Sequence, residues 1–241
     1  MEQSIAPAAS TPVKAKVPVR LGLAVICAGG FMDAYSYLMY GHVFATGQTG
    51  NVVLFTLRLV NGDWLGALGS LAAILSCAVG IFFSMHLLYG VHEGNRYRTQ
   101  RLVALIEVIV FAALAFLPNT VPDLPVNCAI SFCAALAFEN FRSFGTKSAY
   151  SSVFCTGNLR SFAETLYEGL VRHNKHELHR SIRYGALTIF FSVGVLLGVV
   201  TISLLGNYAC LIISAIFLGI SCYLASLDED EKRGGVAPNA H

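Results

Sequence analysis

The residues Gly47–Gln48–Thr49–Gly50–Asn51 decide the fold, because their core, Thr-Gly-Asn, returns as Thr156–Gly157–Asn158 in similar apolar surroundings. At both places polar residues and glycine interrupt a long apolar chain. Unpaired backbone groups are costly in hydrocarbon, so breaks of this kind are tolerated where they line a polar cavity. The repeated motif therefore predicts two corresponding breaks in a membrane-embedded chain.

The composition places the chain among integral membrane proteins. Of its 241 residues, 55% are hydrophobic and 12% are charged, and the mean hydropathy is +0.63; a soluble domain has about 25% charged residues. The net charge is only +2 and the basic residues lie in loops, so we expect no nucleic-acid partner. The seven cysteines lie in apolar stretches without a CxxC pair or a histidine at ligand spacing, so neither disulfides nor a metal or other cofactor are expected.

Six stretches are long and apolar enough to cross a bilayer, which takes about 20 residues of helix. They are Leu21–Tyr40, Trp64–Tyr89, Leu102–Leu117, Leu124–Phe144, Tyr184–Gly206 and Asn207–Leu227. Apart from Arg58, the Lys and Arg residues of the connecting segments fall on one side, which places both termini in the cytoplasm. The sequence thus predicts an all-α, polytopic membrane protein with six transmembrane helices.

The two halves of the chain match each other at an offset of 107 residues. This offset lays Thr49 on Thr156, Asp33 on Asn140 and Phe31 on Phe138. It predicts a single membrane domain with a first repeat at 20–117 and a second at 124–227, a disordered cytoplasmic lead at 1–19 and a cytoplasmic tail at 228–241. Because each half holds three spans, the second copy enters the membrane upside down, as in many secondary transporters.

Each Thr-Gly-Asn segment precedes a short apolar stretch, Asn51–Val60 or Leu159–Val171, the first about 15 Å long as helix. We expect each segment to enter the membrane, turn and return as a re-entrant half-helix, so that two helix N-termini approach near the midplane. Unpaired N–H groups and helix dipoles there favour an anion or an acceptor-rich polar molecule. The alternative is an amphipathic helix on the membrane surface, which suits the charged companions of Leu159–Val171, namely Arg160, Glu164, Glu168 and Arg172.

Ionisable residues at membrane depth mark function or an ion pair, because a charge there is costly. Asp33 and Glu139 lie deep in two predicted spans, and Arg160 follows Asn158 closely. We expect these three to form a midplane cluster in which one carboxylate pairs with the arginine and the other titrates. A purely structural ion pair between the halves is the alternative. Glu107 is expected to reach the cytoplasmic interface by snorkelling.

Small residues recur at four-residue spacing, which allows close helix contact. The pairs are Gly194 with Gly198, Gly66 with Ser70, and Ser76 with Gly80. They indicate either packing within the chain or a homodimer through these small-residue faces.

The chain resembles the YoaK-like family of bacterial membrane proteins of unknown function, DUF1275. The resemblance rests on Gly30–Phe31–Met32–Asp33–Ala34–Tyr35–Ser36–Tyr37, Thr49–Gly50–Asn51 and Phe154–Cys155–Thr156–Gly157–Asn158–Leu159. It implies a six- or seven-span protein of the bacterial inner membrane and no established activity. Where the family tends to carry Gly-x-x-Asn-Ala, this chain has Ala137–Phe138–Glu139–Asn140–Phe141, so the family implies no role for Glu139.

Two functions fit these features. The first is a transporter or channel for a small anion or polar metabolite, and the second is a non-transporting scaffold or sensor whose broken segments are packing joints. Enzyme activity is not expected, because no nucleophile–base or metal constellation stands out. The predicted binding residues are Thr49, Gly50, Asn51, Thr156, Gly157, Asn158, Asp33, Glu139 and Arg160.

Overall fold

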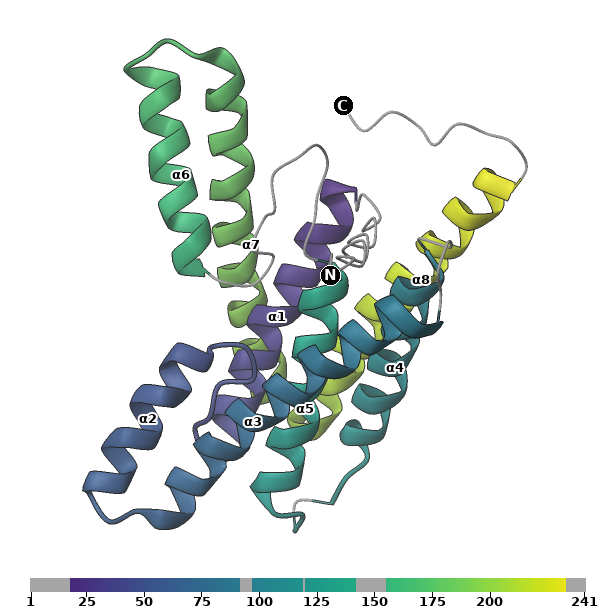
Figure 1. Ribbon diagram of the computed structural model, residues 1–241. Helices are drawn as coiled ribbons and strands as arrows, with labels where there is room; N and C mark the ends of the chain where they lie inside the picture. Colours follow the sequence, from purple (N-terminus) through teal and green to yellow (C-terminus); the bar gives the residue numbers. More distant parts are fainter. Residues whose placement is uncertain (1–17, 92–96, 119, 142–154, 233–241) are drawn as a thin grey trace, which may run out of the picture.

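The computed structural model describes residues 18–91, 97–118, 120–141 and 155–232, and every regular element within these ranges is helical. Figure 1 shows the arrangement and labels the α-helices. In chain order the elements are α1 (Val19–Met39), α2 (Gln48–Val60), α3 (Trp64–His86), the π-helical turn η1 (Leu87–Val91), α4 (Arg98–Ala115), α5 (Asp123–Asn140), α6 (Cys155–Leu170), α7 (Lys175–Leu205), the 3₁₀ turn η2 (Gly206–Ala209) and α8 (Cys210–Lys232).

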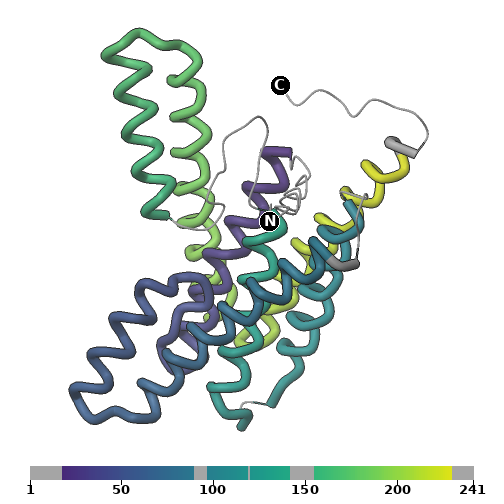
Figure 2. Tube along the Cα trace, in the orientation of Figure 1, coloured from purple at the N-terminus to yellow at the C-terminus, as the bar shows by residue number. Residues whose placement is uncertain are grey.

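Two helical hairpins extend from a common bundle. The hairpin of α2 and α3 points one way and the hairpin of α6 and α7 points the other way, as Figures 1 and 2 show. In the bundle, α1 packs on α7, α3 packs on α5 and α4 packs on α8. Smaller contacts join α4 to α5, α1 to α8 and α1 to α5. The core therefore gathers around α1 and α5, which contribute many of the fully buried side chains.

Glycine sets how closely these helices approach. A Cβ atom added at Gly194 of α7 would overlap the carbonyl oxygen of Cys27 in α1, and one at Gly198 would lie 2.8 Å from the Cβ of Ala34. On the other side of the bundle, a Cβ at Gly80 of α3 would lie 2.7 Å from the carbonyl oxygen of Phe132 in α5. These glycines are thus used for packing inside the chain. Because their faces are covered, a homodimer would need a different surface.

Three segments are long and apolar enough to cross a membrane. They are Val19–Met39, Trp64–Tyr89 and Lys175–Glu229, and the last contains both α7 and α8. The predicted spans Leu102–Leu117 and Leu124–Phe144 correspond to α4 and α5. These two helices also carry polar residues, such as Asn127 and Asn140 in α5, and do not meet the combined criteria of length, hydropathy and few charged residues that the three segments meet. Helix α5 is largely enclosed by its neighbours, and a helix surrounded by protein does not need an apolar surface, whereas α4 packs on α5 and α8 and exposes Leu105 and Ile109 on its other side.

The Thr-Gly-Asn motifs do not precede their helices as expected but form part of the first helical turn. Helix α2 already begins at Gln48 and α6 at Cys155. Helix α2 thus begins three residues before the predicted stretch Asn51–Val60. The side chain of Asn51 folds back onto the preceding loop, where it bonds to the backbone of Phe44.

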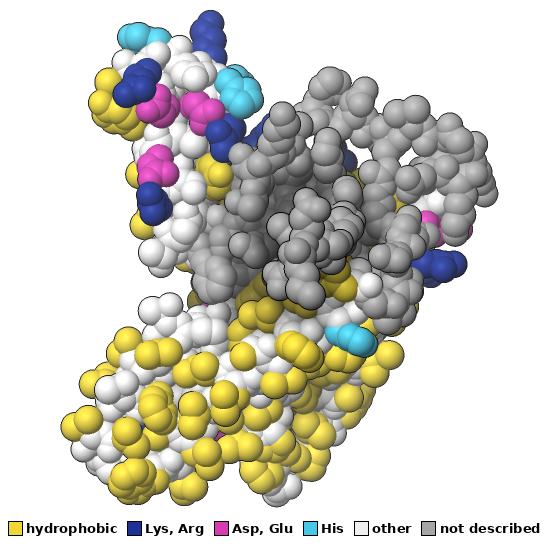
Figure 3. All heavy atoms as spheres, in the orientation of Figure 1, with side chains coloured by type: hydrophobic (Ala, Val, Ile, Leu, Met, Phe, Trp, Pro, Cys, Tyr) yellow, Lys and Arg dark blue, Asp and Glu magenta, His cyan; other side chains and the backbone are white. Residues whose placement is uncertain are grey.

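The surface divides into an apolar and a charged part. Figure 3 shows hydrophobic side chains across the α2–α3 hairpin, where Val53, Val60 and Leu65 are exposed. Lys, Arg, Asp, Glu and His side chains gather instead at the far end of the α6–α7 hairpin. The first surface suits lipid tails and the second suits water or headgroups.

Candidate functional site

Asp33 of α1 is the polar centre of the candidate site. The backbone N–H of Thr46 donates to its Oδ1 and the Thr46 hydroxyl donates to its Oδ2, each at 2.6 Å. Thr46 is buried and lies two residues before α2, so Asp33 ties the first transmembrane helix to the beginning of the next one. A carboxylate is also favoured beside a helix N-terminus, because the helix dipole is positive there.

Asn51 closes the loop that leads into α2. Its Oδ1 accepts a hydrogen bond from the backbone N–H of Phe44 at 2.9 Å, and its Nδ2 donates to the carbonyl oxygen of Phe44 and to Oε1 of Gln48. Asn51 is fully buried. It therefore holds the loop shape and offers no free polar atom to a ligand.

The other two residues of the first motif play different parts. Gly50 lies against the Phe44 ring, and a Cβ atom there would be 2.9 Å from Cδ2 of that ring, so only glycine lets the ring lie on the helix. Thr49 is exposed. Of the first motif, Thr49 alone presents its side chain to the outside.

The second motif lies in the first turn of α6, as the first motif lies in the first turn of α2. Thr156 and Gly157 are exposed, whereas the side chain of Asn158 is buried with 1% exposure. Neither the Oδ1 nor the Nδ2 of Asn158 has a hydrogen-bond partner among the described residues. Its counterpart Asn51 binds the loop before its helix; the corresponding segment here, 142–154, lies outside the described residues.

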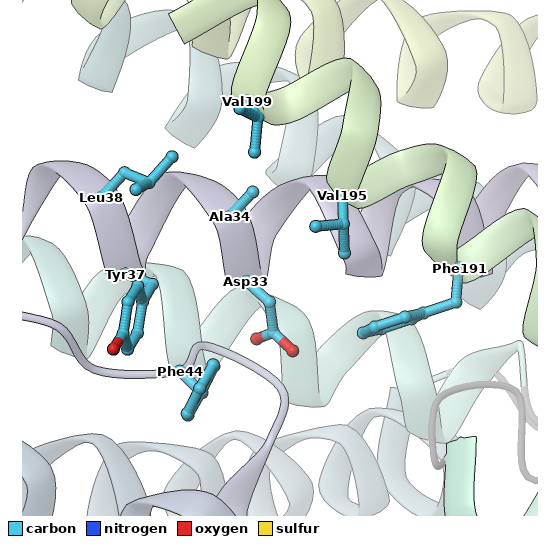
Figure 4. Close-up of a pocket in the computed structure, with 8 residues that line it drawn as sticks. All are labelled: Asp33, Ala34, Tyr37, Leu38, Phe44, Phe191, Val195 and Val199. Carbon is cyan, nitrogen blue, oxygen red and sulfur yellow. The ribbon is translucent and has the colours of Figure 1, made fainter.

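The beginning of α6 approaches Asp33. Cys155, the first residue of α6, lies within electrostatic range of the Asp33 carboxylate. Phe191 of α7 lies beside the same carboxylate in Figure 4. The structure thus brings Asp33 together with the loop before α2 and the first residue of α6.

The predicted ion pair with Arg160 does not form. Arg160 lies on the outer face of α6 with a side chain that is 79% exposed, and its Nε donates to Glu164 at 2.8 Å. An acidic residue four positions along the same helix is a nearer partner than a carboxylate on another helix. Glu139 is half-buried in the last turn of α5. The expected midplane cluster of Asp33, Glu139 and Arg160 is therefore replaced by Asp33 with Thr46.

A cavity of about 200 Å³ adjoins Asp33 between α1 and α7. Figure 4 shows its lining: Asp33, Ala34, Tyr37 and Leu38 from α1, Phe44 from the loop, and Phe191, Val195 and Val199 from α7. The lining is almost entirely apolar, because both Asp33 oxygens point toward Thr46. Pockets with mostly apolar walls and one or two polar groups are typical of small-molecule sites.

Two ionisable residues have roles that the sequence did not reveal. Glu107 does not snorkel: it is fully buried in the middle of α4. Helix α4 begins at Arg98 rather than at the predicted Leu102, so Glu107 lies in the middle of the helix and not near its end.

Arg58 is the second, and it binds the carbonyl oxygens of Gly41, His42 and Gly66 as well as the Ser70 hydroxyl. These contacts explain why one arginine departs from the charge pattern of the loops. The residue locks the α2–α3 hairpin to the turn that follows α1.

Comparison with known proteins gives the family but no activity. The family model for DUF1275, described as a protein of unknown function, matches residues 21–224. The chain is also 26% identical over 182 residues to the UPF0700 transmembrane protein YoaK of Bacillus subtilis (strain 168), which covers 73% of this chain and 80% of that protein. No solved structure matches the chain. The chain is a multi-pass membrane protein and belongs to the DUF1275 family.

Proposed function

We propose that this protein transports a small polar solute across the bacterial inner membrane and binds it beside Asp33, between the N-termini of α2 and α6. The observation that carries this proposal is the carboxylate of Asp33 inside a transmembrane helix, where it adjoins a cavity and the first residue of α6. Ionisable groups at this depth are rare and usually serve substrate or ion pathways.

The transport proposal includes an inverted repeat, and the way in which the helices pack supports it. Exchanging α1 with α5, α2 with α6, α3 with α7 and α4 with α8 reproduces every packed pair of α-helices named above. The equivalent helices α1 and α5 run antiparallel, because Asn127 near the beginning of α5 donates to the carbonyl oxygen of Tyr40 after α1, whereas Phe138 near its end approaches Gly29. Antiparallel equivalents are the arrangement of an inverted repeat, which places substrate sites near the midplane in known transporters.

The depth of α6 also fits a re-entrant half-helix. Gly169 packs on Leu178 and Gly185 packs on Phe162, so α6 and α7 run antiparallel and Cys155 lies level with about residue 192 of α7. The uncharged part of α7 runs from 184 to 205, so α6 begins within about 5 Å of its middle. The charged part of α6 then lies at and beyond the membrane edge. In this arrangement the first part of α6 is a re-entrant half-helix and its charged part is a surface helix.

The first half-helix reaches a similar depth. Arg58 near the end of α2 binds Gly66 and Ser70 near the beginning of α3, so Gln48 lies level with about residue 77, near the middle of α3. The two helices therefore begin at corresponding depths and extend to opposite ends of the bundle.

The occupied N-terminus of α2 narrows the class of solute. Asp33 already holds the position that an anion would take there, so an anion would be repelled from this side. At α6, the buried side chain of Asn158 has no hydrogen-bond partner among the described residues, and the first N–H groups of a helix have no partner within the helix itself. We therefore favour a neutral or zwitterionic metabolite that turns a donor toward Asp33 and an acceptor toward α6 over a simple anion.

The test is a screen of purified protein for thermal stabilisation by small polar metabolites, followed by uptake into proteoliposomes. A ligand at about 100 times its dissociation constant adds about 2.7 kcal/mol of stability. Asp33→Asn and Val199→Phe, which fills the cavity, are expected to abolish the stabilisation. Leu196→Phe is the matched control, because Leu196 lies on the same helix but does not line the cavity.

The outcomes separate the two functions. Stabilisation that is lost in both site variants and kept in the control supports transport through this site. A protein that no metabolite stabilises and that moves none of them into vesicles would instead be a scaffold or sensor, in which the Asp33–Thr46 contact is a packing joint.

A further inference from the structure

Glu107 is a fully enclosed carboxyl group in the helix bundle. Its exposed fraction is 0%, and neither carboxyl oxygen has a hydrogen-bond partner in the described part of the chain. It lies at the tenth position of α4, which packs between α5 and α8. The transport site at Asp33 makes no use of it.

On the described parts of the helices that pack around Glu107, no basic side chain lies beside it. On α5 the ionisable groups are Asp123, Cys128, Cys133 and Glu139, and on the described side chains of α8 they are Cys210, Cys222, Tyr223, Asp228 and Glu229. Of these, Cys133 is the one that lies close enough to interact with Glu107. On α4 itself the two arginines, Arg98 and Arg101, lie in the first turn, about 9 Å or more along the helix.

An ionised carboxylate in such a place is very costly, because neither a partner charge nor a donor replaces its water. The neutral acid removes most of this cost, and it keeps one O–H donor and a carbonyl acceptor. Burial with unpaired oxygens therefore points to a carboxyl group whose ligand is a proton.

Further unpaired oxygens lie at one end of the same helix seam. Gln100 precedes Glu107 by seven residues and so lies on the same face of α4, and its Nε2 donates to the carbonyl oxygen of Asn140 in α5. The Oε1 of Gln100 and the Oδ1 of Asn140 are buried and have no partner among the described residues. Oxygens in this state suit water molecules that donate to them.

We propose that Glu107 is a proton-binding site inside the helix bundle and that it exchanges its proton along the α4–α5 seam toward Gln100 and Asn140. In this step a carboxylate oxygen forms an O–H bond with a proton delivered through water, and the same bond breaks on release. The proposal does not depend on the solute that binds at Asp33.

The side chains along α4 explain the direction of exchange. Toward Gln100, the same face of α4 carries Val103 and Ala104, which are both buried, and Ala104 is the smallest side chain on this face. Toward the other end it carries the buried side chains of Phe111 and Leu114, which close that route. The Oγ of Ser131 and the Oδ1 of Asn127 on α5 also lack partners among the described residues, so the expected direction rests on the small side chain of Ala104 against the bulk of Phe111 and Leu114.

Infrared spectroscopy of the protein in lipid vesicles tests the site directly. At mildly alkaline pH the wild type should show the carbonyl band of a protonated carboxyl group, and Glu107→Gln should lack it. Asp33→Asn controls for the other buried acid and should retain the band. If the spectra of the wild type and Glu107→Gln differ only in carboxylate bands, Glu107 is ionised and the proposal is overturned.

Hydrogen–deuterium exchange of the same band tests the path. Transfer into heavy water should shift the band of the wild type, and Ala104→Leu should slow this shift at least several-fold. Ala115→Leu is the matched control, because Ala115 is buried on α4 beyond Phe111. Equal slowing by both variants would show that the proton does not leave toward Gln100.

Stability provides a second measurement, because glutamine has the shape of the neutral acid. Above the ordinary pKa range of glutamate, a folded state that keeps Glu107 neutral binds one proton more than the unfolded chain. We therefore divide the unfolding equilibrium constant of the wild type by that of Glu107→Gln. In this pH range the ratio should rise by up to about tenfold per pH unit. A ratio that does not change with pH, or a glutamine variant that fails to fold, would contradict a neutral Glu107.

Discussion

At the scale of single residues, the contact of Asp33 with Thr46 holds a carboxylate in the middle of the bundle without a basic partner among the described residues. Thr46→Val keeps the shape of the side chain but leaves Asp33 Oδ2 without its donor. A lost hydrogen bond to a charged group costs about 1.5–3 kcal/mol. We expect Thr46→Val to lower the free energy of unfolding by this amount, measured by denaturant unfolding in detergent.

The control for this substitution is Thr56→Val. The Thr56 hydroxyl donates to the carbonyl oxygen of Val52 on the exposed face of α2, where the loss should cost less than about 0.5 kcal/mol. If Asp33 and Thr46 act together, Thr46→Val should have little further effect once Asp33 is replaced by asparagine. Additive effects of the two substitutions would count against the contact.

Arg58 offers a second residue-scale prediction. Its guanidinium satisfies three carbonyl oxygens and one hydroxyl, and its side chain is only 16% exposed. Arg58→Met keeps the apolar stem but leaves these acceptors unpaired, so we expect a loss of at least about 2 kcal/mol in unfolding free energy.

Arg160→Met is the comparison that makes the Arg58 result specific. Arg160 pairs with Glu164 on an exposed helix face, where water and salt screen the ion pair so that it contributes little to stability. Thermal unfolding of the two variants in the same detergent would rank them. A smaller loss for Arg58→Met than for Arg160→Met would show that the hairpin does not depend on Arg58.

The sequence predicted the burial of Asp33 better than it predicted the residue to which Asp33 is hydrogen-bonded. The position of Asp33 within an apolar stretch predicts a buried carboxylate, and it is buried. Its partner could not be predicted, because Thr46 reaches Asp33 only through the fold of the loop that Asn51 closes. Arg160 shows the converse, since a local i,i+4 partner outcompetes a distant one.

At the scale of elements, close packing of α1 against α7 depends on glycine. A Cβ atom at Gly194 would overlap the carbonyl oxygen of Cys27, so Gly194→Ala must push the two helices apart. Such overpacking costs about 1–3 kcal/mol. The expected result is a lower midpoint of thermal unfolding and a changed cavity beside Asp33.

Gly219→Ala is the matched control for this substitution. Gly219 lies in α8 and an added Cβ would have nothing within 4 Å, so alanine should stabilise the helix by about 0.5–1 kcal/mol. Opposite signs for the two variants are expected. A neutral or stabilising Gly194→Ala would mean that α1 and α7 are less closely packed than the structure indicates.

The positions of the helices could be predicted from the apolar runs, but the burial of polar side chains in α4 and α5 could not. The runs at 102–117 and 124–144 correspond to α4 and α5, and their polar residues Gln100, Glu107 and Asn127 are buried by neighbouring helices. Hydropathy treats each segment as if lipid surrounded it. The short helices α2 and α6 were predicted from their length, although both begin before the Thr-Gly-Asn motif ends.

At the scale of the whole molecule, the proposed inversion places the tips of the two hairpins on opposite sides of the membrane. Asn61 lies at the turn between α2 and α3, and Arg172 lies at the turn between α6 and α7; both are exposed. The basic residues around Arg172 favour the cytoplasmic side for that turn, so the Asn61 turn should face outward.

Single cysteines at these two positions, in a chain whose seven native cysteines are replaced, measure the arrangement in intact cells. A membrane-impermeant maleimide should label Asn61→Cys at once and should label Arg172→Cys only after the membrane is permeabilised. The hairpins begin at similar depth and point in opposite directions, so no single tilt of the bundle brings both tips to one side. Labelling of both cysteines from the outside would therefore refute the inversion and, with it, the proposed approach of two half-helices at Asp33.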